Sequence, residues 1–403
     1  MNAIPSNIVT RAAYLERVAP FIGKNIIKVL TGQRRVGKSY LLFQLMAWIK
    51  NNDSGATIIY INKEDLQFSE LRNAKDLEDY VLKKQAKTGK TFVFIDEIQD
   101  IEQFEAALRS LLLNENFDLY CTGSNANLLS GDIAGHLSGR FIEITVYSLS
   151  YAEFLQFHTL KESDASLDLY MKYGGLPYLK HLPLNDAVVF EYLKNMYSTI
   201  VYRDIINRYA IRNVGFLEQL VQFLAAHTGS VFSAKKISDF LKSQRIQMAP
   251  NQVQVYVQHL VNAFLLHKVA RYDLIGKRLF EIGDKYYFEN LGIRNGIWGY
   301  RLEDRGKIIE NIVYNHLVFR GYEVKVGTLG DKEIDFIAEK NTEKIYVQVA
   351  LSINDEKTLE REYGNLLQIA DNYPKMVVCL DTFSGASHEG ITSMSLRNFL
   401  MTI

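Results

Sequence analysis

The sequence predicts an α/β fold that begins with three layers, in which helices cover both faces of a parallel sheet. Apolar, strand-like runs alternate with helical patterns as far as about residue 152, which is typical of such a domain. Each run is continuous, as expected for strands that are buried on both faces. At 403 residues the chain is too long for one ordinary core, so we expect further domains.

Composition limits the compartment and the partners. Lys plus Arg and Asp plus Glu both number 46, which argues against a protein that coats polyanions over its whole surface. Cys121 and Cys379 lie in apolar, strand-like runs and should be reduced core thiols. No secretory segment opens the sequence, and no apolar run approaches the roughly 20 residues of a membrane helix. We expect a cytoplasmic protein that does not enter the membrane.

A predicted strand at 26–31 leads into the octapeptide Gly32–Ser39, which fills every fixed position of GxxxxGK[ST]. Glycine at both ends lets backbone N–H groups approach a phosphate closely, and the helix expected at 39–50 points its positive end at the same group. Lys38 would reach the β and γ phosphates of ATP, and Ser39 would bind Mg²⁺. The alternative is a glycine-rich turn without a ligand. The candidate nucleotide-binding residues are Gly32, Gln33, Arg34, Arg35, Val36, Gly37, Lys38, Ser39 and Tyr40.

A second apolar strand, 91–97, ends in Asp96 and Glu97. Ligands of open α/β sheets bind at the carboxyl edge of the strands. Asp96 is predicted to hold Mg²⁺ through water, and Glu97 is predicted to be the general base for the attacking water. The alternative is a strand that happens to end in solvated acids.

The next strand, 118–122, leads to Ser124 and Asn125. These residues would sense the γ-phosphate and orient water, or would cap a helix at 126–129. Arg140 precedes a strand at 141–146 and would supply charge to the transition state, or would be a surface arginine. A strand at 57–62 and a helix at 76–87 complete the alternation. The catalytic candidates are Glu97, Lys38, Asn125 and Arg140.

Five blocks carry a family resemblance: LTGQRRVGKSYLL, FVFIDEIQDI, CTGSNANLLSGDIAGHLSGRF, YSLSYAEF and YGGLPYL. They resemble the prokaryotic AAA-type P-loop ATPases that carry a C-terminal domain of unknown function. The likeness continues through YRDII and KYYFENLGIRN to the C-terminus. It implies an ATPase of the AAA+ and signal-transducing group, with a phosphate loop at Lys38–Ser39, an acidic motif at Asp96–Glu97 and a sensor block at Ser124–Asn125. The ATPase core is predicted to span residues 1–152.

Residues 153–213 have one-sided helical periodicity and are predicted to form a helical lid. Within them, Arg203 and Asp204 would respond to nucleotide or form an exposed charge pair.

Residues 214–298 are predicted to form a winged helix, because three helices precede two extended segments. Between residues 229 and 278, eight Lys or Arg stand against two Asp, which favours contact with DNA phosphates. The third helix has no arginine to read guanine edges, and winged helices also dock proteins, so both kinds of partner remain open. The predicted helices are 216–226, 234–242 and 250–264, and the extended segments are 266–273 and 278–282.

Residues 299–403 are predicted to form a second α/β domain with the order helix, three strands, helix and strand. That order resembles the restriction-endonuclease-like superfamily, whose chemistry uses acids and a lysine around Mg²⁺. Glu310, Asp335 and Gln348 match the acidic positions, but the lysine position is Ala350. Unless Lys357 reaches in from the next helix, the missing charge should slow cleavage by about 100-fold or more. We therefore favour a degenerate domain over an active nuclease.

The leading hypothesis is a Mg²⁺-dependent ATPase whose nucleotide state switches the winged-helix and nuclease-like modules. The alternatives are an ATP-regulated DNA nuclease and a nucleotide-gated module that binds protein or DNA with little turnover. An oligomer is compatible with this sequence, and Arg140 would act in its own subunit or in a neighbour's.

Overall fold

The computed structural model describes residues 5, 8–129, 135, 137, 139–276, 283–353, 356–380 and 387–402. The chain forms two compact units. Unit 1 comprises Met1–Tyr147 with Asn262–Phe264, and unit 2 comprises Ser148–Val261 with Leu265–Ile403. Within the described residues, no helix has both the length and the apolar character that a membrane crossing requires.

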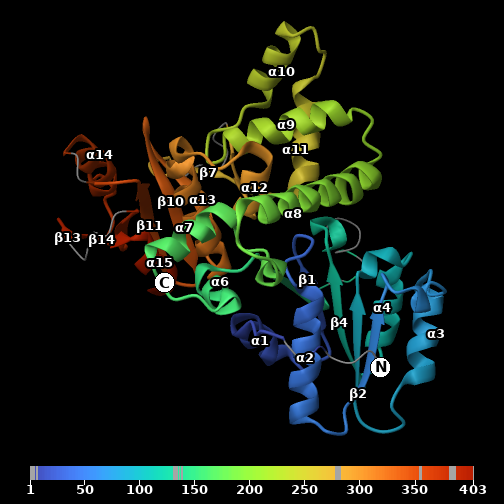
Figure 1. Ribbon diagram of the computed structural model, residues 1–403. Coiled ribbons are helices and arrows are strands. Elements are labelled where there is room, and N and C mark those ends of the chain that lie inside the picture. Colours follow the sequence, from blue (N-terminus) through green and yellow to red (C-terminus); the bar gives the residue numbers. More distant parts are fainter. Residues whose placement is uncertain are drawn as a thin grey trace. The chain divides into compact units, whose positions relative to one another are not determined.

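Unit 1 is built on a five-stranded sheet in the order β2-β3-β4-β1-β5 (Figure 1). Every neighbouring pair is parallel, which confirms the predicted parallel sheet. The carboxyl ends of all five strands therefore meet at one edge, where the predicted motifs are located. The strands are β1 (Ile27–Thr31), β2 (Thr57–Asn62), β3 (Thr91–Asp96), β4 (Phe117–Gly123) and β5 (Phe141–Thr145).

Helices cover both faces of this sheet. Apolar residues that alternate along the strands, such as Val29, Val93 and Leu119, form one core with α3 and α4. The intervening residues point to the opposite face, where α2 packs against β4. The helices are α1 (Ala12–Val18), α2 (Lys38–Asn52), α3 (Ala74–Lys84) and α4 (Phe104–Leu112).

Unit 2 begins with helices, as the sequence predicts. Ser233 accepts a hydrogen bond from the Lys236 N–H and caps α10, and α11 starts at Pro250. Asp204 lies on a π-helix (Ile200–Asn207) and is buried, so it does not belong to an exposed charge pair. The α-helices are α6 (Tyr151–His158), α7 (Asp164–Tyr173), α8 (Asp186–Thr199), α9 (Val214–Ala226), α10 (Ala234–Ser243), α11 (Pro250–Asn262) and α12 (Leu291–Trp298).

The predicted hairpin of the winged helix is paired differently. The segment 266–273 divides into β6 (Leu266–Val269) and β7 (Arg271–Asp273), and β6 pairs antiparallel with β8 (Lys285–Phe288). All residues of β8 are buried, and Phe288 lies opposite Leu266, so β8 supplies an apolar neighbour for the apolar side chain of β6. The predicted second strand, 278–282, lies outside the described residues.

The C-terminal part contains a seven-stranded sheet in the order β13-β14-β12-β11-β10-β9-β7. Strands β9, β10 and β11 form an antiparallel meander, whereas β11 and β12 are parallel and joined through α14. The predicted helices and strands are confirmed with small changes at their ends. β7 precedes the predicted domain border at residue 298, yet it pairs with β9, which lies after that border. The elements are α13 (Arg305–Phe319), β9 (Glu323–Leu329), β10 (Lys332–Lys340), β11 (Glu343–Ala350), α14 (Glu356–Leu367), β12 (Lys375–Cys379), β13 (Ser387–His388), β14 (Ile391–Ser395) and α15 (Leu396–Thr402).

Candidate functional site

The phosphate loop joins β1 to α2 at the carboxyl edge of the sheet in unit 1. Its two glycines have positive φ angles, 141° at Gly32 and 98° at Gly37, which side chains rarely adopt. A Cβ at Gly32 would lie 2.1 Å from the Val146 carbonyl oxygen, so only glycine fits there. The Lys38 ammonium donates hydrogen bonds to the carbonyl oxygens of Gly32 at 2.8 Å and Gln33 at 2.9 Å. The loop therefore folds around its own lysine.

Arg11 braces the loop from behind, a contact that the sequence did not reveal. Its buried guanidinium donates to the carbonyl oxygens of Val36 at 3.1 Å and Tyr147 at 2.9 Å. The first of these acceptors belongs to the phosphate loop and the second follows β5. An arginine outside any motif gives no sequence signal for such a contact, because its partners are 25 and 136 residues away.

Asp96 ends β3 next to Ser39. The hydroxyls of Ser39 and Thr122 hydrogen-bond to its carboxylate, and the Tyr60 hydroxyl donates to Oδ2 at 3.3 Å. Burial raises the pKa of Asp96 and outweighs these hydrogen bonds, which lower it. A hydroxyl beside a buried carboxylate is an oxygen-donor set that suits Mg²⁺, so Ser39 and Asp96 fit the ion that the sequence predicts.

Glu97 follows directly in a left-handed conformation with φ 56°. Burial would raise the pKa of its carboxyl, but the Lys38 ammonium, a hydrogen bond from Gln99 and the Arg34 guanidinium together lower it. Glu97 is therefore an ionised carboxylate near neutral pH, as a proton acceptor must be. Arg34 also pairs with Glu64 at 3.2 Å.

Thr122 on β4 connects the two acids, and sequence reasoning missed it. Its hydroxyl oxygen accepts the Glu97 backbone N–H at 2.9 Å, and the same hydroxyl donates to Asp96 Oδ1. The signal was a polar residue within a buried, otherwise largely apolar strand, because such a hydroxyl requires a partner.

The remaining predicted residues differ in their exposure: those of the sensor block are buried, whereas two of the phosphate loop are exposed. Ser124 and Asn125 are buried after the end of β4, and the Ser124 hydroxyl lies beside the Glu97 carboxylate. A short 3₁₀ helix (Ala126–Leu129) follows them. Arg35 and Tyr40 are exposed.

The structure does not bring Arg140 to this site. Arg140 precedes β5, whose first residue, Phe141, lies opposite Ile27 at the start of β1. The phosphate loop follows the other end of β1, about 15 Å away at the usual rise of a strand. The exposed Arg140 is thus too distant to act on nucleotide in this loop, and a role toward a neighbouring molecule stays a prediction.

Comparison with known proteins identifies the domain that contains this site. The AAA domain family matches residues 24–155, and a domain of unknown function matches residues 164–303. An uncharacterized protein of Haemophilus influenzae is 35% identical over 402 residues, which cover 98% of this chain and 99% of that protein. The chain belongs to the family of this Haemophilus influenzae protein. The family member described here thus combines an AAA-type P-loop ATPase domain with a C-terminal domain of unknown function.

More distant similarities extend to archaeal proteins. An uncharacterized protein of Methanocaldococcus jannaschii is 28% identical and covers 84% of this chain and 77% of its own length. The Walker-type ATPase of Pyrococcus abyssi has a TM-score of 0.49 at 14% identity, covering 72% of this chain and 96% of that one. The Aeropyrum pernix Orc1 protein, solved in complex with DNA, has a TM-score of 0.34 at 12% identity. The similarity covers 73% of this chain and 94% of that one.

The predicted acids of the tail do come together in unit 2. Gln348 Oε1 accepts the Asp335 backbone N–H at 3.3 Å, and burial followed by the Glu310 charge raises the pKa of Asp335 well above its usual range. Ala350, at the predicted lysine position, packs in an apolar cluster. The side chain of Lys357 lies outside the described residues.

A lysine does reach this cluster, but from β8. The Lys285 ammonium lies 2.6 Å from Glu333 Oε1 and 3.1 Å from Glu310 Oε1. Burial would lower the pKa of Lys285, yet the charges of Glu310, Asp335 and Glu333 raise it above its ordinary value. No pattern in the sequence connects Lys285 with these acids, since it precedes the segment that is predicted to be nuclease-like.

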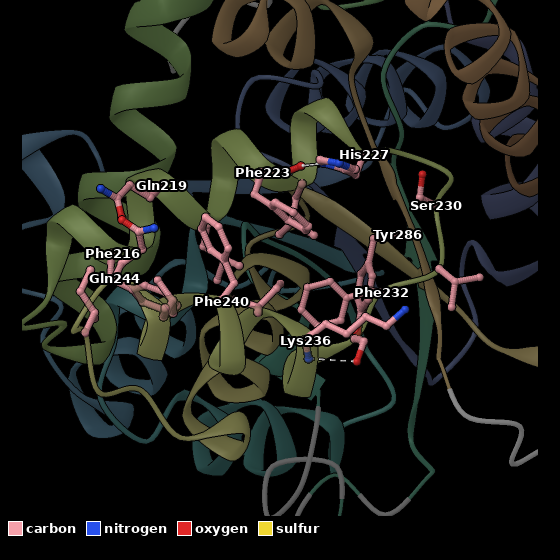
Figure 2. Close-up of a pocket in the computed structure, with 17 residues that line it drawn as sticks. Phe216, Gln219, Phe223, His227, Ser230, Phe232, Lys236, Phe240, Gln244 and Tyr286 are labelled. Atoms are coloured by element: carbon pink, nitrogen blue, oxygen red, sulfur yellow. Dashed lines mark hydrogen bonds between the residues drawn. The ribbon is translucent and has the colours of Figure 1, made fainter.

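Unit 2 also contains an apolar cavity of about 630 Å³ beside α9 and α10 (Figure 2). Phe216 and Phe223 of α9, Phe240 of α10 and the nearby Tyr286 line it, and Phe240 is 64% exposed. Among the described residues, its lining includes no carboxylate and no cysteine. Aromatic and aliphatic side chains form most of its lining, which is typical of a binding surface.

Proposed function

We propose that the protein hydrolyses ATP with Mg²⁺ at the carboxyl edge of the sheet in unit 1. The observation that carries this proposal is the convergence of Lys38, Asp96 and the ionised Glu97 at one point of the fold. P-loop proteins that only bind nucleotide do not require a carboxylate placed to accept a proton from water. The AAA domain match supports the nucleotide as ligand.

Each residue has a separate task in this proposal. The loop amides and Lys38 bind the β and γ phosphates. Ser39 and Asp96 would hold Mg²⁺, which neutralises charge on the phosphates when bound. Glu97 accepts the proton of the attacking water, and Thr122 holds both acids in position through its hydroxyl.

The nucleotide state would be sensed next to Glu97, the proposed general base. Gln99 Nε2 donates to Glu97 Oε2, and Ser124 lies beside the same carboxylate. A γ-phosphate that engages Lys38, Ser124 or Asn125 would change these contacts and order the neighbouring loops until hydrolysis releases them.

Replacing Lys38 with alanine tests the binding step. Loss of its charged hydrogen bonds, worth about 1.5–3 kcal/mol, should weaken ATP binding by about 10- to 100-fold. Isothermal titration with ATP and Mg²⁺ measures the change. Lys50→Ala on the same helix is the matched control and should bind like the parent, whereas unchanged binding by Lys38→Ala would contradict the proposed phosphate site.

For the rest of the chain we propose the predicted division into a core (1–152), lid (153–213), winged helix (214–298) and degenerate nuclease-like domain (299–403). The helix order α9, α10, α11 before the β6–β8 pair supports the winged helix. The order α13, β9, β10, β11, α14, β12 supports the nuclease-like fold.

The second candidate function is nucleotide-gated DNA binding through the winged helix. Four basic residues are exposed on α10 and just after it, which would present positive charge to phosphates: Lys235, Lys236, Lys242 and Arg245. The exposed Phe240 and the apolar cavity nearby fit a protein partner instead.

Salt dependence separates these two partners. If the four basic residues contact DNA, the logarithm of the affinity should fall with the logarithm of salt concentration with a slope of about −3 to −4. Their combined replacement by glutamine should remove most of that slope in fluorescence anisotropy with duplex DNA. Lys194→Gln, which changes an exposed lysine on α8, is the control. If the variant with all four replacements retains DNA as well as the parent does, this candidate function is rejected.

A further inference from the structure

The chain passes between the two units at three places: after Tyr147, after Val261 and after Phe264. The segment Asn262–Phe264 (the junction) belongs to unit 1, although most of α11 precedes it in unit 2 and β6 follows it in unit 2. The sequence pattern predicts one continuous helix at 250–264, but α11 ends at Asn262. Three residues from the segment that is predicted to be a winged helix are therefore part of the unit that contains the phosphate loop.

The junction is bonded to the phosphate loop through Gln33. The Gln33 side chain is 0% exposed, and its Nε2 atom donates a hydrogen bond to the Phe264 carbonyl oxygen at 2.9 Å. Phe264 has a φ of 54°, in the left-handed region that residues other than glycine rarely adopt. A buried hydrogen bond between residues 231 positions apart thus holds the backbone at the point where the chain turns out of α11.

The backbone of Gln33 is bonded to the lysine of the same loop. Its carbonyl oxygen accepts a hydrogen bond from the Lys38 ammonium at 2.9 Å. The side-chain oxygen of Gln33 is buried and has no hydrogen-bond partner among the described residues, which is costly for an amide. The bond to Phe264 therefore orients this side chain, and Gln33 connects the phosphate-binding ammonium to the junction.

The first crossing is held by the phosphate loop as well. Tyr147 is the last residue of unit 1 before this crossing. Its carbonyl oxygen accepts a hydrogen bond from Arg11, which also donates to the Val36 carbonyl oxygen in the loop. The Tyr147 N–H donates to the Tyr14 hydroxyl at 2.9 Å. Two of the three crossings are thus connected to the phosphate loop by hydrogen bonds inside unit 1.

Within unit 2, Glu289 binds the residues that follow these two crossings. The Glu289 carboxylate accepts hydrogen bonds from the Ser148 N–H at 2.5 Å and from the Ser148 hydroxyl at 2.9 Å. The Glu289 N–H donates to the Leu265 carbonyl oxygen at 3.2 Å. Ser148 follows the first crossing and Leu265 follows the junction, so a change at either crossing acts on the same buried glutamate.

We propose that Gln33 is a positioning residue that couples occupancy of the phosphate loop to the junction. Loop amides that bind a phosphate group are fixed by it, so the Gln33 backbone and its bond to Phe264 become more rigid at the same time. The coupling is reciprocal: a junction that is held in place favours the loop geometry that binds phosphate. The proposal rests on the proposed nucleotide site of unit 1, but it does not depend on hydrolysis.

Hydrogen exchange of the full-length chain, followed by mass spectrometry with and without Mg²⁺ and ADP, tests the coupling. ADP occupies the loop and is not hydrolysed. In the parent, saturating ADP should slow exchange in peptides that cover residues 261–269 by about 5-fold or more, the lower end of usual couplings between sites. Gln33→Met keeps the length of the side chain but has no donor, so it should lose this slowing. Gln85→Met changes an exposed glutamine after α3 and should behave like the parent.

Two results would overturn the proposal. The first is a parent whose phosphate loop is protected by ADP while residues 261–269 exchange as they do without it. The second is a Gln33→Met protein, saturated with ADP as shown by titration, that keeps the full slowing. If Gln33→Met does not fold or does not bind ADP, Gln33→Asn replaces it, because its amide is one methylene too short for the bond to Phe264 and the slowing should again be lost.

The same preparation separates this proposal from the proposed ATPase activity. A chain that binds nucleotide and shows the change at 261–269, but never hydrolyses ATP, would refute hydrolysis and support the coupling. A chain that hydrolyses ATP without any change at 261–269 would refute the coupling and support hydrolysis. A chain that binds neither ATP nor ADP in titration would refute both.

Discussion

At the scale of single residues, the nucleotide site depends on side chains that share their partners. Thr122 bonds to both Asp96 and Glu97, and Gln99 and Lys38 both act on Glu97. Several side chains therefore fix the positions of Asp96 and Glu97 together. A change in one of them should alter catalysis even if that residue does not contact the nucleotide. Thr122 is the clearest case, because it lies in a fully buried strand and its hydroxyl bonds to both acids.

Thr122→Val tests this positioning role. Valine keeps the shape but leaves the Glu97 N–H and Asp96 Oδ1 without their hydroxyl, at a cost of about 1.5–3 kcal/mol when the partner is charged. We expect the rate of ATP hydrolysis to fall by about 10-fold or more with smaller effects on ATP binding. Thr122→Ser should restore the rate in steady-state assays, and equal rates for serine and valine would refute the role of the hydroxyl.

At the scale of elements, local motifs were predictable and contacts between distant segments were not. The phosphate loop and the strand that ends in Asp96 are read from contiguous residues, so their elements were predicted correctly. The Lys28 ammonium pairs with Asp118 inside the sheet, yet in the sequence both residues look like ordinary parts of strands. β6 likewise pairs with β8, beyond the segment first expected.

The same reasoning applies to the tail and the N-terminal segment. The order of strands and helices around Glu310, Asp335 and Gln348 follows from their periodicity, whereas Lys285 enters from outside that segment. Arg11 reaches Val36 from a segment without a recognisable motif. Side-chain contacts across many residues depend on packing, which periodicity does not encode.

Gly32→Ala tests the fit between the phosphate loop and its neighbour. The new Cβ would lie 2.1 Å from the Val146 carbonyl oxygen at a φ of 141°, so the backbone must move at a cost of about 1–3 kcal/mol. We expect a lower melting temperature and loss of ATP binding, measured by calorimetry. Gly55→Ala is the control, since its Cβ would meet only Asp53 Oδ1 at 3.5 Å; equal stability of the two variants would contradict the tight fit.

At the scale of the whole molecule, the two units contain two charge clusters of different character. In unit 1, Lys38 lies beside acids whose neighbouring hydroxyls and loop amides suit Mg²⁺ and phosphate. In unit 2, Lys285 is paired with the acids and is covered by the loop that contains Gly229. Of these two clusters, the first has the arrangement that we propose for hydrolysis, so we assign catalysis to unit 1.

The most direct test of that claim is hydrolysis by Glu97→Gln, followed in a single turnover with ATP in limiting amount. Glutamine keeps the size of the side chain but accepts no proton, so the chemical step should slow by about 100- to 10,000-fold, while titration shows ATP binding close to that of the parent. Glu102→Gln, an exposed acid five residues further along, should hydrolyse ATP normally. A Glu97→Gln protein that binds ATP and hydrolyses it at the parental rate would contradict the account.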